Sequence, residues 1–200
     1  MYIRPFVYIM YTILQISFSA SPRCWWLAVK YVTYSYRFAE QVLNSHLAIK
    51  NELVDVIESI GLPTVAPDAG DRPGAGSKPN VRPQLNKRFE EEFKKRGWES
   101  QFRLFDDPGN PMAKIDFMKS RVGVEVAFSH ASFLGIDLLK FQVLSYADLD
   151  KIDVGIYIVP TNEMPRRGFE GSVTFDKVKL YLPHLRSAIQ VPVWVVGLVP

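Results

Sequence analysis

The chain has 200 residues, and its 48% hydrophobic and 22% charged content is typical of a globular protein with a substantial core. This length predicts one compact domain. The formal net charge of +3 at pH 7 is too small to identify a partner, so it permits DNA binding without proving it. The single cysteine, Cys24, excludes an internal disulfide and a multi-cysteine zinc site, and three scattered histidines argue against a histidine-rich metal site. A metal ion held by oxygen ligands is compatible with the composition.

Residues 1–28 differ in composition from the rest of the chain. An early Arg4, an apolar stretch and then small residues are typical of a secretory signal, but the stretch is too short and too interrupted to predict a membrane span. A mis-called start codon upstream of the true one and an ordered helix are the alternatives. We therefore divide the chain into a hydrophobic N-terminal extension, 1–28, and a domain at 29–200. We expect a cytoplasmic protein without a stable membrane partner, or a secreted or membrane-anchored one if the extension is a real signal.

Regular patterns begin at Lys30, where the aromatic and β-branched run KYVTYSY predicts a strand. From Tyr36 to Ile60, apolar residues recur at three- and four-residue steps, which predicts a helix that Asn44-Ser45 could divide in two. The Gly61-Leu62-Pro63 sequence ends this helix. His46 lies on its apolar side, where a hydrogen-bonded core histidine is a better interpretation than a ligand.

Residues 63–83 contain five prolines and three glycines without periodicity, which predicts a long loop. Basic side chains gather in this loop and at the start of the next helix: Arg72, Lys78, Arg82, Lys87 and Arg88. The loop could close over DNA, or it could be a solvated segment without such a role. Gln84 to Arg96 then predicts a helix that Gly97 ends, and Trp98 to Leu104 predicts a strand. The sequence does not say which of the helix acids at 90–92 faces a functional site.

The segment Ala113–Phe128, AKIDFMKSRVGVEVAF, contains two short alternating runs and predicts a β-hairpin. Strict alternation places the apolar side chains on one face: Ala113, Ile115, Phe117, Val122, Val124, Val126 and Phe128. It places two acids on the opposite face, together with Gly123 and Ala127. The missing side chain of Gly123 would let a ligand approach the backbone closely.

The register of the hairpin determines how the two acids lie. A two-residue loop at 120–121 pairs Lys119 with Val122 and sets Asp116 directly across from Glu125. Opposed residues have Cβ atoms about 5 Å apart, where two like charges destabilise a sheet. A hard divalent cation held between the carboxylates would remove this repulsion. The alternative is an ordinary amphipathic hairpin whose solvent face carries two acids.

The C-terminal part of the chain predicts two helices and two strands. The segment Ala131–Ala147 is apolar nearly all round, which predicts a helix buried against the sheet. A continuous apolar run at Asp153–Val159 predicts a strand that is covered on both faces. Phe175–Ile189 predicts a helix that tolerates Pro183, and Val191–Leu198 predicts the last strand. Their order and type indicate an α/β (α+β) fold, a mixed sheet with helices on both sides.

Asp116, eight residues and then Glu125-Val126-Ala127 resemble the PD-(D/E)xK nuclease motif. The surrounding IDFMKSRVGVEVAFSHASFLGIDLLKFQ and the later KIDVGIYIVP are similar to the BglII and BstYI group of type II restriction endonucleases. The likeness extends from about Tyr31 to the C-terminus and is most specific between Lys114 and Pro160. It implies a restriction-endonuclease-like fold, double-stranded DNA as substrate, Mg²⁺ as cofactor and a homodimer that matches a palindromic site.

The resemblance also implies site residues. Asp116 and Glu125 would be catalytic and would hold the metal. The family usually has Lys, Glu or Gln where this chain has Ala127, so Lys119 and Lys140 are the candidate substitutes. Candidate DNA contacts are Ser129 and His130 at the end of the second acidic strand, Arg166 and Arg167 in a later loop, and Arg72 and Lys78 in the long loop.

Three functions are consistent with these patterns. The first is a type II restriction endonuclease of a restriction-modification system. The second is a DNA-binding protein of the same fold with impaired catalysis, because Ala127 replaces a functional side chain. The third is a non-nuclease α/β domain with an acidic hairpin. A neighbouring methyltransferase gene would separate the first from the others.

Overall fold

The computed structural model describes residues 26–28, 30–63, 81–105, 114–146, 149–164 and 168–200. In chain order the elements are β1 (Trp26–Ala28), β2 (Lys30–Tyr36), α1 (Ala39–Ser45), α2 (Leu47–Ser59), β3 (Gly61–Pro63), α3 (Arg82–Lys95), β4 (Glu99–Arg103), β5 (Lys114–Lys119), β6 (Val122–Val126), the 3-10 helix η1 (Ala131–Phe133), α4 (Leu134–Ser145), β7 (Val154–Pro160), α5 (Phe175–Tyr181), the 3-10 helix η3 (Leu182–Leu185) and β8 (Val193–Val199). None of the helices in these ranges has the length and apolar content that a membrane crossing needs.

A mixed six-stranded sheet in the order β2-β8-β7-β6-β5-β4 forms the centre of the molecule. The β6, β7 and β8 strands are parallel, and the other neighbouring pairs in this sheet are antiparallel. The predicted strand at 98–104 and the predicted hairpin at 113–128 thus form an antiparallel meander, β4-β5-β6. Every residue of β7 is buried, which fits the prediction of a strand that is covered on both faces.

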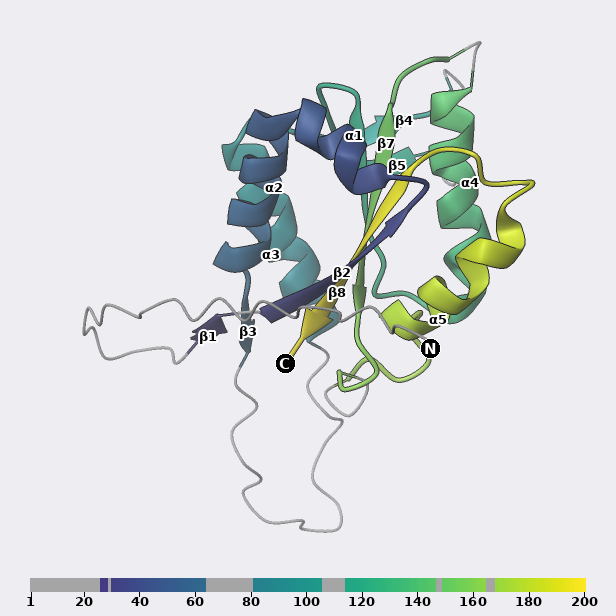
Figure 1. Ribbon diagram of the computed structural model, residues 1–200. Coiled ribbons are helices and arrows are strands. Elements are labelled where there is room, and N and C mark those ends of the chain that lie inside the picture. The colour runs from purple at the N-terminus through teal and green to yellow at the C-terminus, as the bar shows by residue number, and fades with distance from the viewer. Residues whose placement is uncertain (1–25, 29, 64–80, 106–113, 147–148, 165–167) are drawn as a thin grey trace, which may run out of the picture.

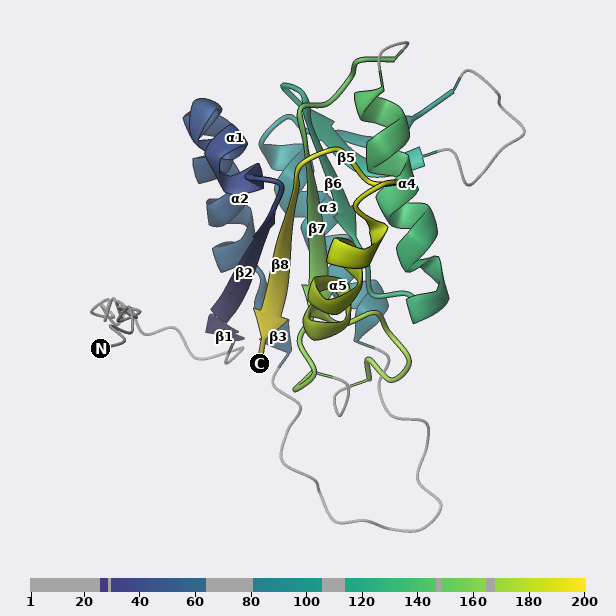
Figure 2. The same cartoon turned by 45° about the vertical axis from the view of Figure 1, so that its right-hand side comes forward.

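Helices cover both faces of the sheet (Figures 1 and 2). On one face, α1, α2 and α3 pack over a core that contains Leu53, Phe89 and Phe93. On the other face, α4 and α5 pack over a second core that includes Leu138 and Phe141. The predicted mixed sheet with helices on both sides is confirmed.

Two predicted helices are interrupted, and each break has a local cause. The helix predicted from Tyr36 to Ile60 divides at His46, next to the Asn44-Ser45 break site. The imidazole is partly buried, and its Nε2 lies 3.3 Å from Asp153 Oδ2, so a side-chain partner holds it as the sequence suggests. The helix predicted to tolerate Pro183 instead ends at Tyr181, because the chain continues as the 3-10 helix η3 that contains this proline.

The last residues of the N-terminal extension take part in regular structure. β1, at Trp26–Ala28, pairs antiparallel with β3 in a separate two-stranded sheet. The signal-like stretch before it lies outside the described residues, as does most of the long loop.

Candidate active site

The tip of the β5-β6 hairpin has the geometry that its two-residue loop requires. Ser120 and Arg121 have φ angles of 46° and 64°, and Lys119 pairs with Val122 as predicted. Both loop residues are thus left-handed, as in a type I′ turn. The Arg121 guanidinium donates to Asp150 Oδ1 at 2.6 Å and to Asp153 Oδ1 at 2.8 Å. These contacts hold the hairpin tip against the start of β7.

The sheet is irregular where Asp116 lies. The β5-β6 ladder runs from the hairpin tip to Phe117 and Val124, and the next pair in register would be Asp116 and Glu125. That pair does not form. Instead, the Val126 backbone N–H donates a hydrogen bond to Asp116 Oδ2 at 2.9 Å, so a side-chain oxygen takes the place of a backbone acceptor. On the other side of β5, pairing with β4 skips Gln101, which has a φ of 56°.

This irregularity changes the faces that strict alternation predicts. Ile115 belongs to the core under α4, whereas Phe117 belongs to the core under α3 and stacks on Phe93 at a ring-centroid distance of 4.3 Å. The prediction that Ile115 and Phe117 share a face is therefore wrong. Alternation assumes a regular pleat, and the pleat is interrupted at Asp116 between them.

Gly123 also has a different role from the predicted one. A Cβ atom at this position would lie 2.7 Å from Ile115 Cδ1 and 3.4 Å from Ile152 Cγ2. The absence of a side chain makes room for these two core residues. The prediction that the glycine admits a ligand is wrong, because its face is filled by packing.

Glu125 lies on the opposite side of β6 from the α3 core, under α4. It is only 4% exposed, and Lys140 Nζ donates to its Oε1 at 2.8 Å. Burial raises the pKa of Glu125 well above its ordinary value, and the negative charge of Asp116 raises it further, while Lys140 opposes the shift. The charge of Asp116 thus acts on Glu125 in the direction that the hairpin register predicts.

The α4 helix brings a second acid to the same place. Lys140 Nζ lies 3.3 Å from Asp137 Oδ1, and the buried Tyr157 hydroxyl donates to Asp137 Oδ2 at 3.0 Å. Burial would lower the pKa of Lys140, but Glu125 and Asp137 more than offset it, so the pKa is raised. Burial also raises the pKa of Asp137, and it raises that of Tyr157 well above normal, with the Asp137 charge adding to the tyrosine shift. Asp137 and Tyr157 were not identified as site residues from the sequence. The available signal for Asp137 was its position three residues before Lys140 in an otherwise apolar helix.

The two candidate lysines are placed differently. Lys140 touches Glu125, whereas Lys119 Nζ donates to Glu52 Oε2 at 2.7 Å and to the Arg96 carbonyl at 2.6 Å. Lys119 thus ties the hairpin to α2 and does not join the acids. Ala127 is 3% exposed and packs in the core under α4, on the same face as Glu125.

A cavity of about 250 Å³ opens beside Asp116 and is lined by residues of α3, β4, β5 and the end of β6. Its polar lining comes from Asn86 and Glu90 of α3, Ser100 and Gln101 of β4, and Asp116 itself. The structure thus distinguishes the three helix acids. Glu90 lines the cavity and also pairs with Lys94, whereas Glu91 is exposed near Lys87 and Glu92 pairs with Lys95 and Arg96 away from the cavity lining.

The end of β6 meets the chain that follows the later basic loop. Ser129 and His130 are exposed there. The Ser172 hydroxyl donates to the Phe128 carbonyl at 2.9 Å, and the Ala131 N–H donates to the Gly171 carbonyl at 2.9 Å. Arg166, Arg167, Arg72 and Lys78 lie outside the described residues.

The acidic pair fits a hard divalent cation. Mg²⁺ commonly keeps several waters and takes one or two carboxylates together with substrate phosphates. The described ranges contain no group of three or more His, Cys, Asp or Glu side chains that could hold a metal by themselves. Asp116 and Glu125 would thus supply two ligands, and a cation there would offset both the burial of the Glu125 charge, which is the larger cause of its raised pKa, and the smaller effect of the Asp116 charge.

An acidic pair on an antiparallel hairpin, continued by parallel strands between two helical layers, defines a PD-(D/E)xK restriction-endonuclease-like fold. Residues 31–198 match the family model of the restriction endonucleases BglII/BglIII. The chain belongs to this family, and membership supports a DNA nuclease. It counts against the third hypothesis, a non-nuclease α/β domain with an acidic hairpin.

Solved structures agree with this fold. The chain is similar to BglII complexed with a DNA 16-mer, at a TM-score of 0.63 and 20% identity over 86% of this chain and 77% of that one. It is also similar to free BglII, at a TM-score of 0.58 and 19% identity over 86% of this chain and 80% of that one. A comparison with curated protein sequences gave no match.

Proposed function

We propose that this protein is a Mg²⁺-dependent type II restriction endonuclease that hydrolyses phosphodiester bonds in double-stranded DNA. The observation that carries the proposal is the placement of Asp116 and Glu125 on neighbouring strands, with the first beside a polar cavity and the second buried. Membership of the BglII/BglIII family supports the substrate class.

The acidic residues have separate tasks in this proposal. Asp116 and Glu125 hold the ion, and the Val126 N–H fixes the orientation of Asp116 by donating to its Oδ2. A bound Mg²⁺ would polarise the scissile phosphate and lower the pKa of an attacking water. Glu90 is the α3 acid that we assign to the cavity, because it is the one of the three helix acids that lines it.

Lys140 would compensate only in part for Ala127, because its ammonium group is already paired with Glu125 and Asp137. Its ammonium group contacts Glu125 at 2.8 Å on the face where Ala127 lies. We propose it as the substitute in preference to Lys119, whose Nζ is bonded to Glu52 and the Arg96 carbonyl. Asp137 holds Lys140 in place through an ion pair, and the Tyr157 hydroxyl orients Asp137 by donating a hydrogen bond to it.

DNA would approach along the end of β6, where the exposed Ser129 and His130 lie. Arg166 and Arg167, in the loop that leads to the Phe128 and Ala131 contacts, and Arg72 and Lys78 in the long loop would contact phosphates. Such contacts position the duplex without reading its sequence.

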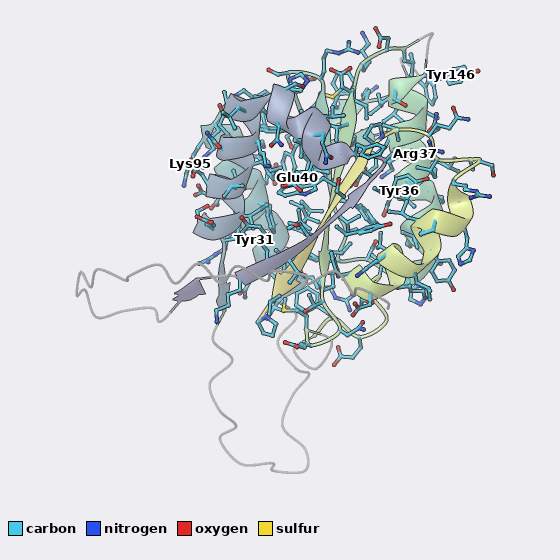
Figure 3. The ribbon with its side chains drawn as sticks, viewed as in Figure 1. Tyr31, Tyr36, Arg37, Glu40, Lys95 and Tyr146 are labelled. Atoms are coloured by element: carbon cyan, nitrogen blue, oxygen red, sulfur yellow. The ribbon has the colours of Figure 1, made fainter. Side chains whose placement is uncertain are left out.

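An apolar stripe on α4 supports the proposed homodimer. Ile136, Leu139, Val143 and Tyr146 recur at steps of three and four residues, which places them on one side of the helix. Leu139 is 48% exposed and Tyr146 is 64% exposed. Figure 3 shows Tyr146 at the end of α4, pointing away from the fold. A second copy of the chain would bury this stripe and create a two-fold protein for a palindromic site.

The direct test is cleavage of mixed-sequence DNA with Mg²⁺, with Ca²⁺, and with chelator. We expect discrete fragments with Mg²⁺ alone and none from Asp116→Asn, which is nearly isosteric with the native side chain. Cleavage by Asp116→Asn equal to that of the native chain would refute the assignment of the site.

The second candidate is a DNA-binding protein of the same fold that does not cleave. Ala127 is the observation that favours it, because a buried methyl group cannot position water. Tight DNA binding with Ca²⁺, together with no cleavage at any Mg²⁺ concentration, would select this function.

A further inference from the structure

Gln101 has a backbone conformation that its residue type disfavours. It lies inside β4 with a φ of 56°, in the left-handed region that non-glycine residues enter at a cost. The residues beside it pair normally with β5, Ser100 with Phe117 and Phe102 with Ile115, so the distortion is confined to one position. A glycine would adopt this conformation without strain, yet the chain has glutamine there.

The side chain of Gln101 reaches the first candidate acid. Its Nε2 donates to Asp116 Oδ1 at 3.1 Å, while the Val126 backbone N–H donates to Oδ2 at 2.9 Å. The two donors come from strands on opposite sides of β5. Each carboxylate oxygen of Asp116 therefore has one fixed partner, and the plane of the carboxylate is determined by β4 and β6 together.

The position of Gln101 suits a role in the cavity and not in the core. Its side chain is exposed and lines the cavity together with Asn86 and Glu90. It belongs to neither hydrophobic core cluster, so core packing does not account for the strained backbone. Strain that surrounding packing does not need is typical of positions held for function.

We propose that Gln101 is a positioning residue that orients Asp116 for metal binding, and that its left-handed backbone is the strain that this orientation requires. The inference rests on the proposed function, because it assigns Asp116 as a metal ligand. Gln101 is not in the PD-(D/E)xK pattern and lies on a different strand, 15 residues before the acid. It adds β4 to the strands that build the site.

Three variants separate orientation from strain. Gln101→Met keeps an unbranched side chain and the strained backbone but removes the amide. Gln101→Gly removes the amide and also relieves the strain. Glu99→Gln, two residues earlier on the same strand and away from the cavity, is the matched control. The full chain is melted without metal and then across a Mg²⁺ titration, and cleavage of mixed-sequence DNA is measured over the same Mg²⁺ range.

We expect Gln101→Met to melt close to the native chain without metal, while its half-saturating Mg²⁺ concentration rises about 10- to 100-fold, as for partners that orient a metal ligand. Gln101→Gly should show the same weaker Mg²⁺ response but melt about 2 °C higher without metal, because its backbone is relaxed. Glu99→Gln should match the native chain in both measurements.

The possible failures are distinguishable. If Gln101→Met keeps the native Mg²⁺ dependence while the native chain is stabilised by Mg²⁺, the positioning role is refuted and the proposed function stands. A Gln101→Gly variant that melts below the native chain in the absence of metal refutes the proposal that the Gln101 backbone is strained. A native chain that Mg²⁺ neither stabilises nor activates refutes the proposed function and this inference together.

Discussion

Lys140→Met should destabilise the protein to an extent that depends on pH. The Lys140 side chain is 16% exposed and lies between two buried carboxylates, at 2.8 Å from Glu125 and 3.3 Å from Asp137. Removal of one partner of a buried ion pair costs about 3–5 kcal/mol, because the remaining charge stays desolvated. For a chain of this length, that corresponds to a fall of about 10 °C in melting temperature.

The pH dependence follows from Glu125. Its pKa is already raised by burial and by Asp116, and loss of the Lys140 charge raises it further. Between the ordinary pKa of a glutamate, about 4.3, and the raised value, the native state binds more protons than the unfolded state. Stability therefore falls as pH rises through this window. The loss caused by Lys140→Met should be smaller at pH 5 than at pH 8, because a protonated Glu125 needs no partner.

The assay is urea denaturation at both pH values for Lys140→Met, Glu125→Gln and the double variant. The double variant should regain most of the stability that Lys140→Met loses, because Glu125→Gln removes the buried charge that has no partner. Lys87→Met is the control: Lys87 is 77% exposed and 3.9 Å from Glu91, and a surface pair of this kind contributes at most about 1 kcal/mol. A loss for Lys140→Met that is equal at both pH values, or losses that simply add in the double variant, would refute the reasoning.

Four further results are expected. Mg²⁺ or Ca²⁺ should raise the melting temperature of the native chain, and Asp116→Asn should abolish the rise; a rise that survives would place the ion elsewhere. The native protein should cleave slowly, and Ala127→Gln or Ala127→Lys should raise single-turnover cleavage on DNA that is already bound, by up to about 100-fold. Both Ala127 variants should lose about 1–3 kcal/mol of stability in urea denaturation, because the longer side chain crowds the core under α4. Ala127 variants that bind DNA normally but cut no faster would contradict the assignment of this position to catalysis. Residues 29–200 should melt and bind DNA like the full chain; a collapse on truncation would show that the earlier residues, including β1, are structural. Leu139→Glu should shift sedimentation from dimer to monomer, and an unchanged dimer would exclude the α4 stripe as the interface.

The sequence predicts regular elements well where a pattern repeats. KYVTYSY gives β2 with the bounds that the structure shows, and the apolar run of β7 identifies a doubly covered strand. The hairpin loop and its register also follow from local spacing, because two left-handed residues at 120–121 allow one close pairing of the strands.

The sequence fails where two distant segments determine the local geometry. The interrupted pleat at Asp116 depends on Gln101 in another strand and on the Val126 N–H, and alternation within β5 contains neither partner. The contact between Lys140 and Glu125 joins a helix to a strand across the second core. The apolar residues of α4 predict burial on all sides, but one side stays exposed because the sheet can cover only the other.

The position of β8 in the sheet has a consequence for folding. This strand is the last element of the described chain and lies between β2, near the beginning, and β7. Its partners are thus separated by more than 100 residues of sequence, from Lys30–Tyr36 to Val154–Pro160. Pairings between such distant segments form slowly, because the entropy cost of closing a large loop comes before any stabilising contact forms. A growing chain would therefore lack a partner for β2 and for one side of β7 until β8 emerges, and the acidic hairpin would lack its complete sheet until that point.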